Sequence, residues 1–387
     1  MFEFNKMDAL IFSLLSYFDI FDYEQGMELT TFADHLLHDP QYMEQQKTDL
    51  YTLECLEFAK SFDYSRYTGF KITDYVNLNN QSGLALMCFE NETTMYICLR
   101  GSEFLDKEYH RCGWEDWKDN IAIFQKVTWQ QLQAIDYLNQ LPTHKKIVLL
   151  GHSKGGNLSL FLSLTCSEER LAQIEHVYTF NAPGINEVMM SDYAHRAKDE
   201  AYLDKLTLFE NEHDTVSSLF LHLKEPIYLS SINDNRNLQQ MYHNHQLYAI
   251  KMEDDLIEAK GKSYIPKLVD SFINQLFVRL PQSMINDVLS LWNDYIESDY
   301  GMDELYHIFL YHIGKYTHIF DELDYAQIKE IEFETIFITL KKETANEIAS
   351  IPKLISHVIE SIKESNIENY IKHATVLVEN LKNKIKL

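Results

Sequence analysis

A serine flanked by glycines at fixed spacing stands in the stretch KKIVLLGHSKGGNLSLFLSL, residues 145–164. Gly151-His152-Ser153-Lys154-Gly155 has the form G-x-S-x-G, the pattern of a nucleophile elbow, in which a buried strand turns directly into a helix. Such a turn holds its central residue in a strained backbone conformation, and the residues two positions before and after it must be small to avoid collision. The pattern predicts that Ser153 presents its hydroxyl at the carboxyl end of a sheet and at the N-terminus of a helix.

The surroundings of the motif agree with an elbow. The chain of 387 residues contains only 12 glycines, and three of them are Gly151, Gly155 and Gly156. The apolar run 146–150 is typical of a buried strand, and the apolar residues at 158, 161 and 162 recur at helical spacing. The competing interpretation is a tight strand-to-helix turn whose serine has no catalytic role.

A serine hydroxyl becomes a nucleophile when a neighbouring base takes its proton, and the base needs an acid that orients it. In α/β-hydrolases the acid follows the serine in the chain and the histidine comes last. The stretch KLTLFENEHDTV, residues 205–216, ends a predicted strand, and we select Asp214 as the acid because it precedes an apolar turn. The acidic alternatives in this region are Glu210, Glu212 and Asp204.

The base must lie on a later loop, and MYHNHQLYAI, residues 241–250, offers two histidines. We predict His245 as the base and keep His243 as the alternative. The other histidines of this part of the chain, His213 and His222, lie too near the acid in sequence. The pair of histidines could also suggest a metal, with Asp214 as a further ligand, but no third clear ligand follows at a standard spacing. We therefore predict neither a metal nor a cofactor.

The negative charge that develops on the substrate oxygen needs preorganised donors. The backbone N–H of Lys154, the residue after the nucleophile, is one expected donor. The second donor usually comes from a loop after an earlier strand, and Arg100-Gly101-Ser102 follows such a strand at TMYICLR. We predict Ser102 as that donor, against the alternative that this segment is an ordinary glycine-containing turn.

The elements that must position these residues divide the chain into three regions. Residues 1–60 form a helical lead-in, with apolar residues at helical spacing over 10–18 and, less regularly, over 50–57. Residues 61–255 alternate strands and helices, with a hairpin turning at 91–92, a helix over 129–141 and strands at 145–153, 176–184 and 205–214. This alternation predicts an α/β-hydrolase-type, mostly parallel sheet flanked by helices. Residues 256–387 carry apolar stripes of helical period, which predict an all-helical C-terminal domain that serves as a lid, a partner-binding bundle or added core.

Composition restricts the partners and the compartment. The chain has 34 Lys and Arg against 59 Asp and Glu, a net charge of −25, which repels nucleic acid and anionic membranes. Five cysteines without a Cys-x-x-Cys pair favour reduced thiols. The first residues lack the basic and small-residue features of a secretory signal, and no apolar run is long enough to span a membrane. We expect a cytoplasmic protein without a transmembrane segment.

Together these stretches resemble known enzymes. LRGS, then W-x-D-W, GHSKGGNLSL and FNAPG are similar to the pattern of class 3 lipases, and a histidine opening H-x-L-Y brings the chain closer to a bacterial lipase-like α/β-hydrolase family of unknown function called Mbeg-like. The resemblance spans about residues 5–250. It implies Ser153 as nucleophile, Asp214 as acid, His245 as base, and Ser102 and Lys154 as oxyanion donors. The acid segment departs from the compact loops of class 3 lipases, which carry glycine or proline near the aspartate.

We therefore expect a serine hydrolase, similar to lipases and esterases, that cleaves small acyl or lipid-like carboxylic esters through an acyl-enzyme on Ser153. A thioesterase or an acyltransferase would use the same serine with a different leaving group or acceptor. The alternative from another class is a hydrolase-fold binding or regulatory protein that acts through its helical tail, by a protein partner or by self-association.

Overall fold

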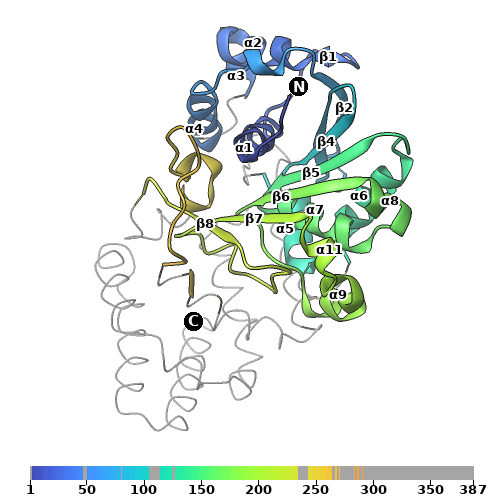
Figure 1. Cartoon of the computed structure of the whole chain (residues 1–387). Coiled ribbons are helices and arrows are strands. Elements are labelled where there is room, and N and C mark those ends of the chain that lie inside the picture. The colour runs from blue at the N-terminus through green and yellow to red at the C-terminus, as the bar shows by residue number, and fades with distance from the viewer. Residues whose placement is uncertain are drawn as a thin grey trace, which may run out of the picture. The chain divides into compact units, whose positions relative to one another are not determined.

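The computed structural model describes residues 2–46, 50–79, 81–103, 114–123, 127–233 and 243–263, with single positions at 266, 267, 270, 283, 286 and 290 (Figure 1). The chain divides into two compact units, the first made of Met1–Asp234 with Tyr242–Ser263 and the second of Asn235–Met241 with Tyr264–Leu387. The helical stripes predicted for the C-terminal domain lie almost wholly outside the described residues. The predicted lead-in, residues 1–60, belongs to the first unit together with the sheet.

An eight-stranded mixed sheet runs through the first unit, and its strands lie side by side in chain order. The strands are β1 (Met27–Glu28), β2 (Lys71–Asn77), β3 (Ala85–Glu90), β4 (Thr94–Leu99), β5 (Lys146–His152), β6 (Ile174–Phe180), β7 (Leu206–Asn211) and β8 (Ile227–Leu229). The pairings from β1 to β4 are antiparallel and those from β4 to β8 are parallel. The prediction of a mostly parallel sheet flanked by helices is confirmed, except that the first strands are antiparallel. For β3 and β4 this agrees with the predicted hairpin. The segments that join β2 to β3 and β3 to β4 are too short for the crossover that parallel pairing requires.

Helices and short helical turns connect these strands. α1 (Lys6–Leu15) precedes β1. Between β1 and β2 in the chain lie α2 (Leu29–His38), α3 (Pro40–Gln46) and α4 (Leu50–Ala59). Those that follow β4 are α5 (Trp114–Ala122), α6 (Trp129–Gln140), α7 (Lys154–Thr165), α8 (Glu168–Gln173), α9 (Glu187–Asp192), α10 (Ala194–Ala197) and α11 (Glu200–Leu203). Single 3₁₀ turns occur at η1 (Ser65–Tyr67) and η2 (Leu247–Ala249). The predicted helix over 129–141 is confirmed as α6, whose first turn is closed by a capping box between Thr128 and Gln131.

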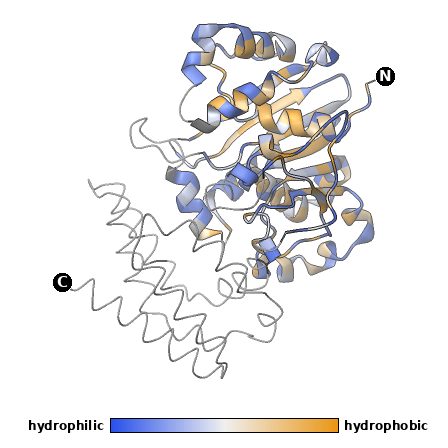
Figure 2. Ribbon diagram, turned by 90° about the vertical axis from the view of Figure 1, so that its left-hand side faces the viewer, coloured by the Kyte–Doolittle hydropathy of each residue, from blue (hydrophilic) through white to orange (hydrophobic). Residues whose placement is uncertain are grey.

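The two faces of the sheet carry separate apolar cores. In β4, Tyr96 and Cys98 pack in one core with α1, whereas Ile97 and Leu99 pack in the other with α6 and α7. This alternation follows from the period of two in a strand, where successive side chains point to opposite faces. Figure 1 shows α1 on one side of the sheet and α6 and α7 on the other, and Figure 2 shows hydrophobic residues concentrated between these layers.

The first helix ends earlier than its apolar pattern predicts. α1 begins at a capping box formed by Asn5 and Asp8 and stops at Leu15, with Ser16 as its C-cap. Tyr17 and Phe18, which continue the apolar spacing, therefore lie beyond the helix. None of the helices in the described part of the chain is long and apolar enough to cross a membrane.

Candidate active site

The predicted elbow is present between β5 and α7. Ser153 has φ of 56° and ψ of −128°, a positive φ that L-residues rarely adopt. Its backbone N–H donates to the carbonyl of Phe180 at 2.9 Å, so the strained residue is still tied to the neighbouring parallel strand. Strain held in place by surrounding structure is typical of functional turns.

The glycines of the motif are required by close backbone contacts. A Cβ atom on Gly151 would lie 2.2 Å from the carbonyl carbon of Gly155, and a Cβ atom on Gly155 would lie 1.9 Å from the carbonyl oxygen of Leu99. A Cβ atom on Gly156 would lie 2.5 Å from that of Ala182. The small residues therefore allow α7 to start directly against β4 and β5, as the steric account of the motif requires.

The structure brings together the three residues selected from the sequence. His245 Nε2 lies 2.7 Å from Ser153 Oγ, and His245 Nδ1 lies 3.0 Å from Asp214 Oδ1. Because the carboxylate accepts the Nδ1 proton, Nε2 is left to accept the proton of the serine hydroxyl. All three residues are buried. This geometry matches the arrangement of nucleophile, base and acid found in serine hydrolases.

The turn after β7 holds the carboxylate of Asp214 in a fixed orientation. Its Oδ1 accepts the backbone N–H of Val216 and its Oδ2 accepts that of Ser217, both at 3.0 Å. Burial acts to raise the pKa of Asp214, but the facing His245 and these backbone N–H groups outweigh it and hold the pKa below its ordinary value. Asp214 is therefore an ionised, oriented carboxylate.

The acidic alternatives lie elsewhere. Glu210 is buried beside Lys262, whose Nζ lies 3.3 Å from Glu210 Oε2, and beside His222. Glu212 Oε1 accepts the backbone N–H of Ser231 at 3.3 Å. Asp204 is the exposed C-cap of α11. None of the three has a described bond to His245.

The side chains of the alternative histidines His243 and His222 contact residues other than Ser153. His243 Nδ1 lies 2.9 Å from Tyr248 Oη and 3.4 Å from Glu54 Oε2. His222 faces Glu210 across 3.3 Å, and the backbone N–H of His213 donates to the side chain of Asn211. Within the described residues, no group of three or more His, Cys, Asp and Glu side chains could hold a metal ion.

The predicted oxyanion segment lies against the elbow. A Cβ atom on Gly101 would lie 2.7 Å from the carbonyl oxygen of His152 and 3.0 Å from Ser153 Cβ. The next residue, Ser102, accepts a hydrogen bond on its Oγ from Asn120 Nδ2 at 2.8 Å. Lys154 is the first residue of α7, where backbone N–H groups have no acceptor within the helix. The segment and the helix start thus border the serine from two directions.

A second role for Lys154 has no counterpart in the motif. Its side chain is buried, and its Nζ lies 2.9 Å from Asp119 Oδ2 and donates to the carbonyl of Asp116 at 3.1 Å. Both aspartates belong to α5, the helix that also carries Asn120. The ion pair therefore fastens α5 to the elbow. The sequence shows that Lys154 follows Ser153. It does not show that the side chain of Lys154 is buried or that its partners are Asp116 and Asp119.

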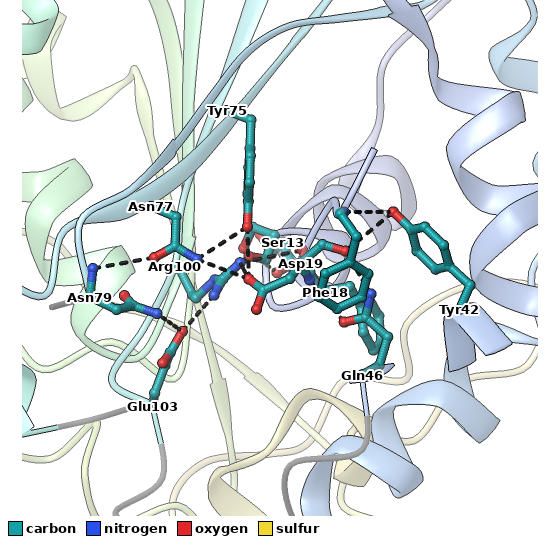
Figure 3. Close-up of polar contacts among 12 residues, drawn as sticks. Ser13, Phe18, Asp19, Tyr42, Gln46, Tyr75, Asn77, Asn79, Arg100 and Glu103 are labelled. Carbon is teal, nitrogen blue, oxygen red and sulfur yellow. Dashed lines mark hydrogen bonds and ion pairs between the residues drawn. The ribbon is translucent and has the colours of Figure 1, made fainter. Parts of the chain in front are cut away.

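Arg100, which begins the predicted oxyanion segment Arg100-Gly101-Ser102, is buried and lies in a polar network (Figure 3). Its guanidinium donates to the carbonyl of Phe18, forms an ion pair with Asp19 at 3.0 Å and contacts Glu103. The Asp19 carboxylate also accepts the hydroxyl of Tyr75 at 2.7 Å. The network joins the end of β4 to the segment that follows α1.

Residues 62–292 match the Mbeg1-like family. The chain belongs to the Mbeg1-like family. The matched residues of this Mbeg1-like chain include Ser153, Asp214 and His245, whereas Phe18 and Asp19, which hold Arg100, precede the match. No curated protein matches the chain.

Proposed function

We propose that this Mbeg1-like protein is a serine hydrolase that cleaves carboxylic esters through an acyl-enzyme on Ser153. The observation that carries the proposal is the hydrogen-bonded chain from Ser153 Oγ through His245 to Asp214, at 2.7 and 3.0 Å. A lone serine at a tight turn would need neither an imidazole nor a buried, oriented carboxylate behind it. The strained backbone of Ser153 supports the same conclusion.

In the first half of the reaction, Ser153 Oγ attacks the ester carbonyl while its proton passes to His245 Nε2. Asp214 stabilises the imidazolium that forms. The oxyanion of the tetrahedral intermediate accepts hydrogen bonds from the backbone N–H groups of Lys154 and Ser102. The intermediate then expels the alkoxide, which takes the proton from His245 and leaves as an alcohol.

In the second half, His245 removes a proton from water and the resulting hydroxide attacks the acyl-enzyme. The bond between Ser153 Oγ and the acyl carbon breaks, the carboxylic acid leaves, and the serine regains its proton from His245. The same residues serve both halves, so no cofactor enters the proposal.

The proposed substrates are small acyl or lipid-like esters. Support for this finer assignment comes from the likeness of the Arg100-Gly101-Ser102 segment and the elbow to class 3 lipases, and from the close approach of Gly101 to Ser153. Thioesters are the alternative, because only the leaving group differs. Hydrolysis of matched series of p-nitrophenyl esters and acyl thioesters of increasing chain length separates the two.

Covalent labelling tests the reaction class. A fluorophosphonate should phosphonylate Ser153 of the wild type, with Ser153 Oγ bonded to phosphorus and fluoride released. Ser153→Ala should not be labelled, whereas Ser159→Ala should be labelled as the wild type is, because Ser159 lies on the same helix but bonds to the carbonyls of Leu150 and Gly155. Absence of labelling in the wild type, or equal labelling of Ser153→Ala, would favour the non-enzymatic alternative, a binding or regulatory protein.

A further inference from the structure

A second hydrogen-bonded chain runs behind the three residues of the proposed reaction. Tyr17 Oη lies 2.6 Å from His152 Nδ1, and His152 Nε2 lies 2.7 Å from the backbone carbonyl oxygen of His245. A carbonyl oxygen only accepts, so Nε2 of His152 carries a proton. Burial, together with the neighbouring His245, lowers the pKa of His152 to about 3, so the ring is neutral at physiological pH. In a neutral ring Nδ1 then accepts, and the Tyr17 hydroxyl donates to it.

The same carbonyl of His245 is also held by Asn181. Asn181 Nδ2 donates to it at 2.8 Å, while Asn181 Oδ1 accepts the backbone N–H of Asn211 at 2.7 Å. Asn181 follows β6 and His152 ends β5, so the two donors come from the carboxyl ends of neighbouring parallel strands. The backbone of His245 is therefore fixed directly to the sheet.

This attachment sets the position of the proposed base relative to the serine. His152 is the chain neighbour of Ser153, so a single rigid strand end carries both the nucleophile and the donor that holds the backbone of His245. The distance between Ser153 Oγ and His245 Nε2 depends on that backbone position. Displacements of about 1 Å at a reacting pair can cost on the order of a hundredfold in rate.

Tyr17 is part of this hydrogen-bonded chain but lies outside the residues that match the family. It lies after the end of α1, and its hydroxyl presses on the oxyanion segment, where a Cβ atom on Gly101 would be 2.1 Å from Tyr17 Oη. That same Cβ position lies 3.0 Å from Ser153 Cβ, so the Tyr17 hydroxyl is within about 5 Å of Ser153 Cβ. The N-terminal segment thus extends into the proposed active site.

We propose that Tyr17 is a positioning residue for the ester hydrolysis proposed above, on which this inference rests. By donating to Nδ1 of His152, Tyr17 keeps the proton of that ring on Nε2. His152 then holds the carbonyl of His245, in parallel with Asn181. The N-terminal segment is in this way a part of the catalytic apparatus, although it precedes the family match.

The test removes only the hydroxyl. Tyr17→Phe should lower kcat for a short-chain p-nitrophenyl ester about tenfold while KM stays within about twofold, because the loss affects geometry during reaction and not substrate contact. Tyr202→Phe is the matched control, since it removes a buried hydroxyl that bonds to Ser163, and its kcat should equal that of the wild type. Thermal unfolding of both variants measures any general loss of stability.

Ring-nitrogen NMR of the wild type provides a second readout, with the His152 resonances assigned by His152→Gln. The neutral tautomer protonated on Nε2 is expected. An imidazolium or a proton on Nδ1 would overturn the inference, and so would an unchanged kcat in Tyr17→Phe or an equal loss in Tyr202→Phe. If the wild type is labelled by fluorophosphonate, these results leave the proposed function standing. A wild type that neither reacts with fluorophosphonate nor cleaves esters ends both proposals.

Discussion

Asp19 and Arg100 stand 81 positions apart in the chain, yet their side chains form an ion pair of 3.0 Å beside the proposed active site. The guanidinium is almost fully buried, whereas the carboxylate is about one-third exposed. Because Arg100 begins the oxyanion segment, this pair fixes the second proposed donor to the N-terminal segment, just as Tyr17 fixes the proposed base. Both sides of the serine thus depend on residues 17–19.

Asp19→Asn should lower the free energy of unfolding by about 1–2 kcal/mol at pH 7, less than the ~3–5 kcal/mol typical of a fully buried pair because Asp19 is partly exposed. Burial acts to raise the pKa of Asp19, but Arg100 and the hydrogen bonds outweigh it and lower the pKa. The stabilisation is therefore complete above the ordinary Asp pKa and is lost as the pH falls below it.

The gap in Tm between the wild type and Asp19→Asn should accordingly narrow from pH 6 to pH 3, as measured by thermal unfolding. Asp34→Asn is the control, since Asp34 forms an exposed surface pair with His38. A gap that stays constant with pH, or an equal effect of the control, would contradict the assignment.

Glu210 should make stability fall as the pH rises. Burial raises the pKa of Glu210 to about 8 despite the nearby Lys262, so the folded protein keeps this proton over a range where the unfolded chain has released it. Its neighbours are Lys262, His222, Ser217 and Asp214. Between about pH 4.5 and pH 8 the unfolded state binds fewer protons, and the free energy of unfolding declines.

Glu210→Gln removes this titration. The Tm of the variant relative to the wild type should therefore rise by several degrees from pH 5 to pH 9. Glu169→Gln, an exposed change on α8, should follow the wild type at every pH. Parallel curves for Glu210→Gln and the wild type would refute the raised pKa.

Gly155→Ala should prevent stable folding or cost more than about 3 kcal/mol, because the added methyl would lie 1.9 Å from the backbone oxygen of Leu99, which cannot move without displacing β4. Gly69→Ala is the comparison, since it meets nothing within 4 Å and carries only the strain of its φ of +88°. That strain costs about 1–2 kcal/mol. Chemical denaturation of both variants measures the difference, and equal losses would argue against the steric account of the elbow.

The hydrogen bond from Asn120 to Ser102 should contribute to kcat, so that the loss of either partner has the same effect. Ser102→Ala keeps the backbone N–H proposed as oxyanion donor but loses the contact from Asn120 Nδ2. We expect kcat to fall about tenfold in Ser102→Ala and in Asn120→Ala, and no further in the double variant, because both changes break one interaction. Steady-state kinetics of the four proteins complete the cycle. Multiplied losses in the double variant would show that the two residues act independently.

The elbow and its flanking elements could be predicted because their causes are local. The glycines at 151, 155 and 156 indicate a close backbone contact within a few residues. The apolar patterns on either side predict β5 and α7. The hairpin of β3 and β4 could also be predicted from the sequence, because Asn91 lies in a short turn between the two strands. The antiparallel direction of β2 follows from the short segment that joins it to β3. The pairing of β1 with β2, in which Met27 lies opposite Ile72, joins segments far apart in the chain, and no local pattern predicts it.

The sequence by itself determined the nucleophile candidate, the order of its partners and the short list of residues for each place. Only the tertiary structure distinguished Asp214 from Glu210, and His245 from His243, because side chains two to four positions apart point to different neighbours once strand and turn are folded. The same holds for Tyr17, which is 135 positions from His152. A contact over such a separation is created by packing of α1 on the sheet, and no local pattern of residues specifies it.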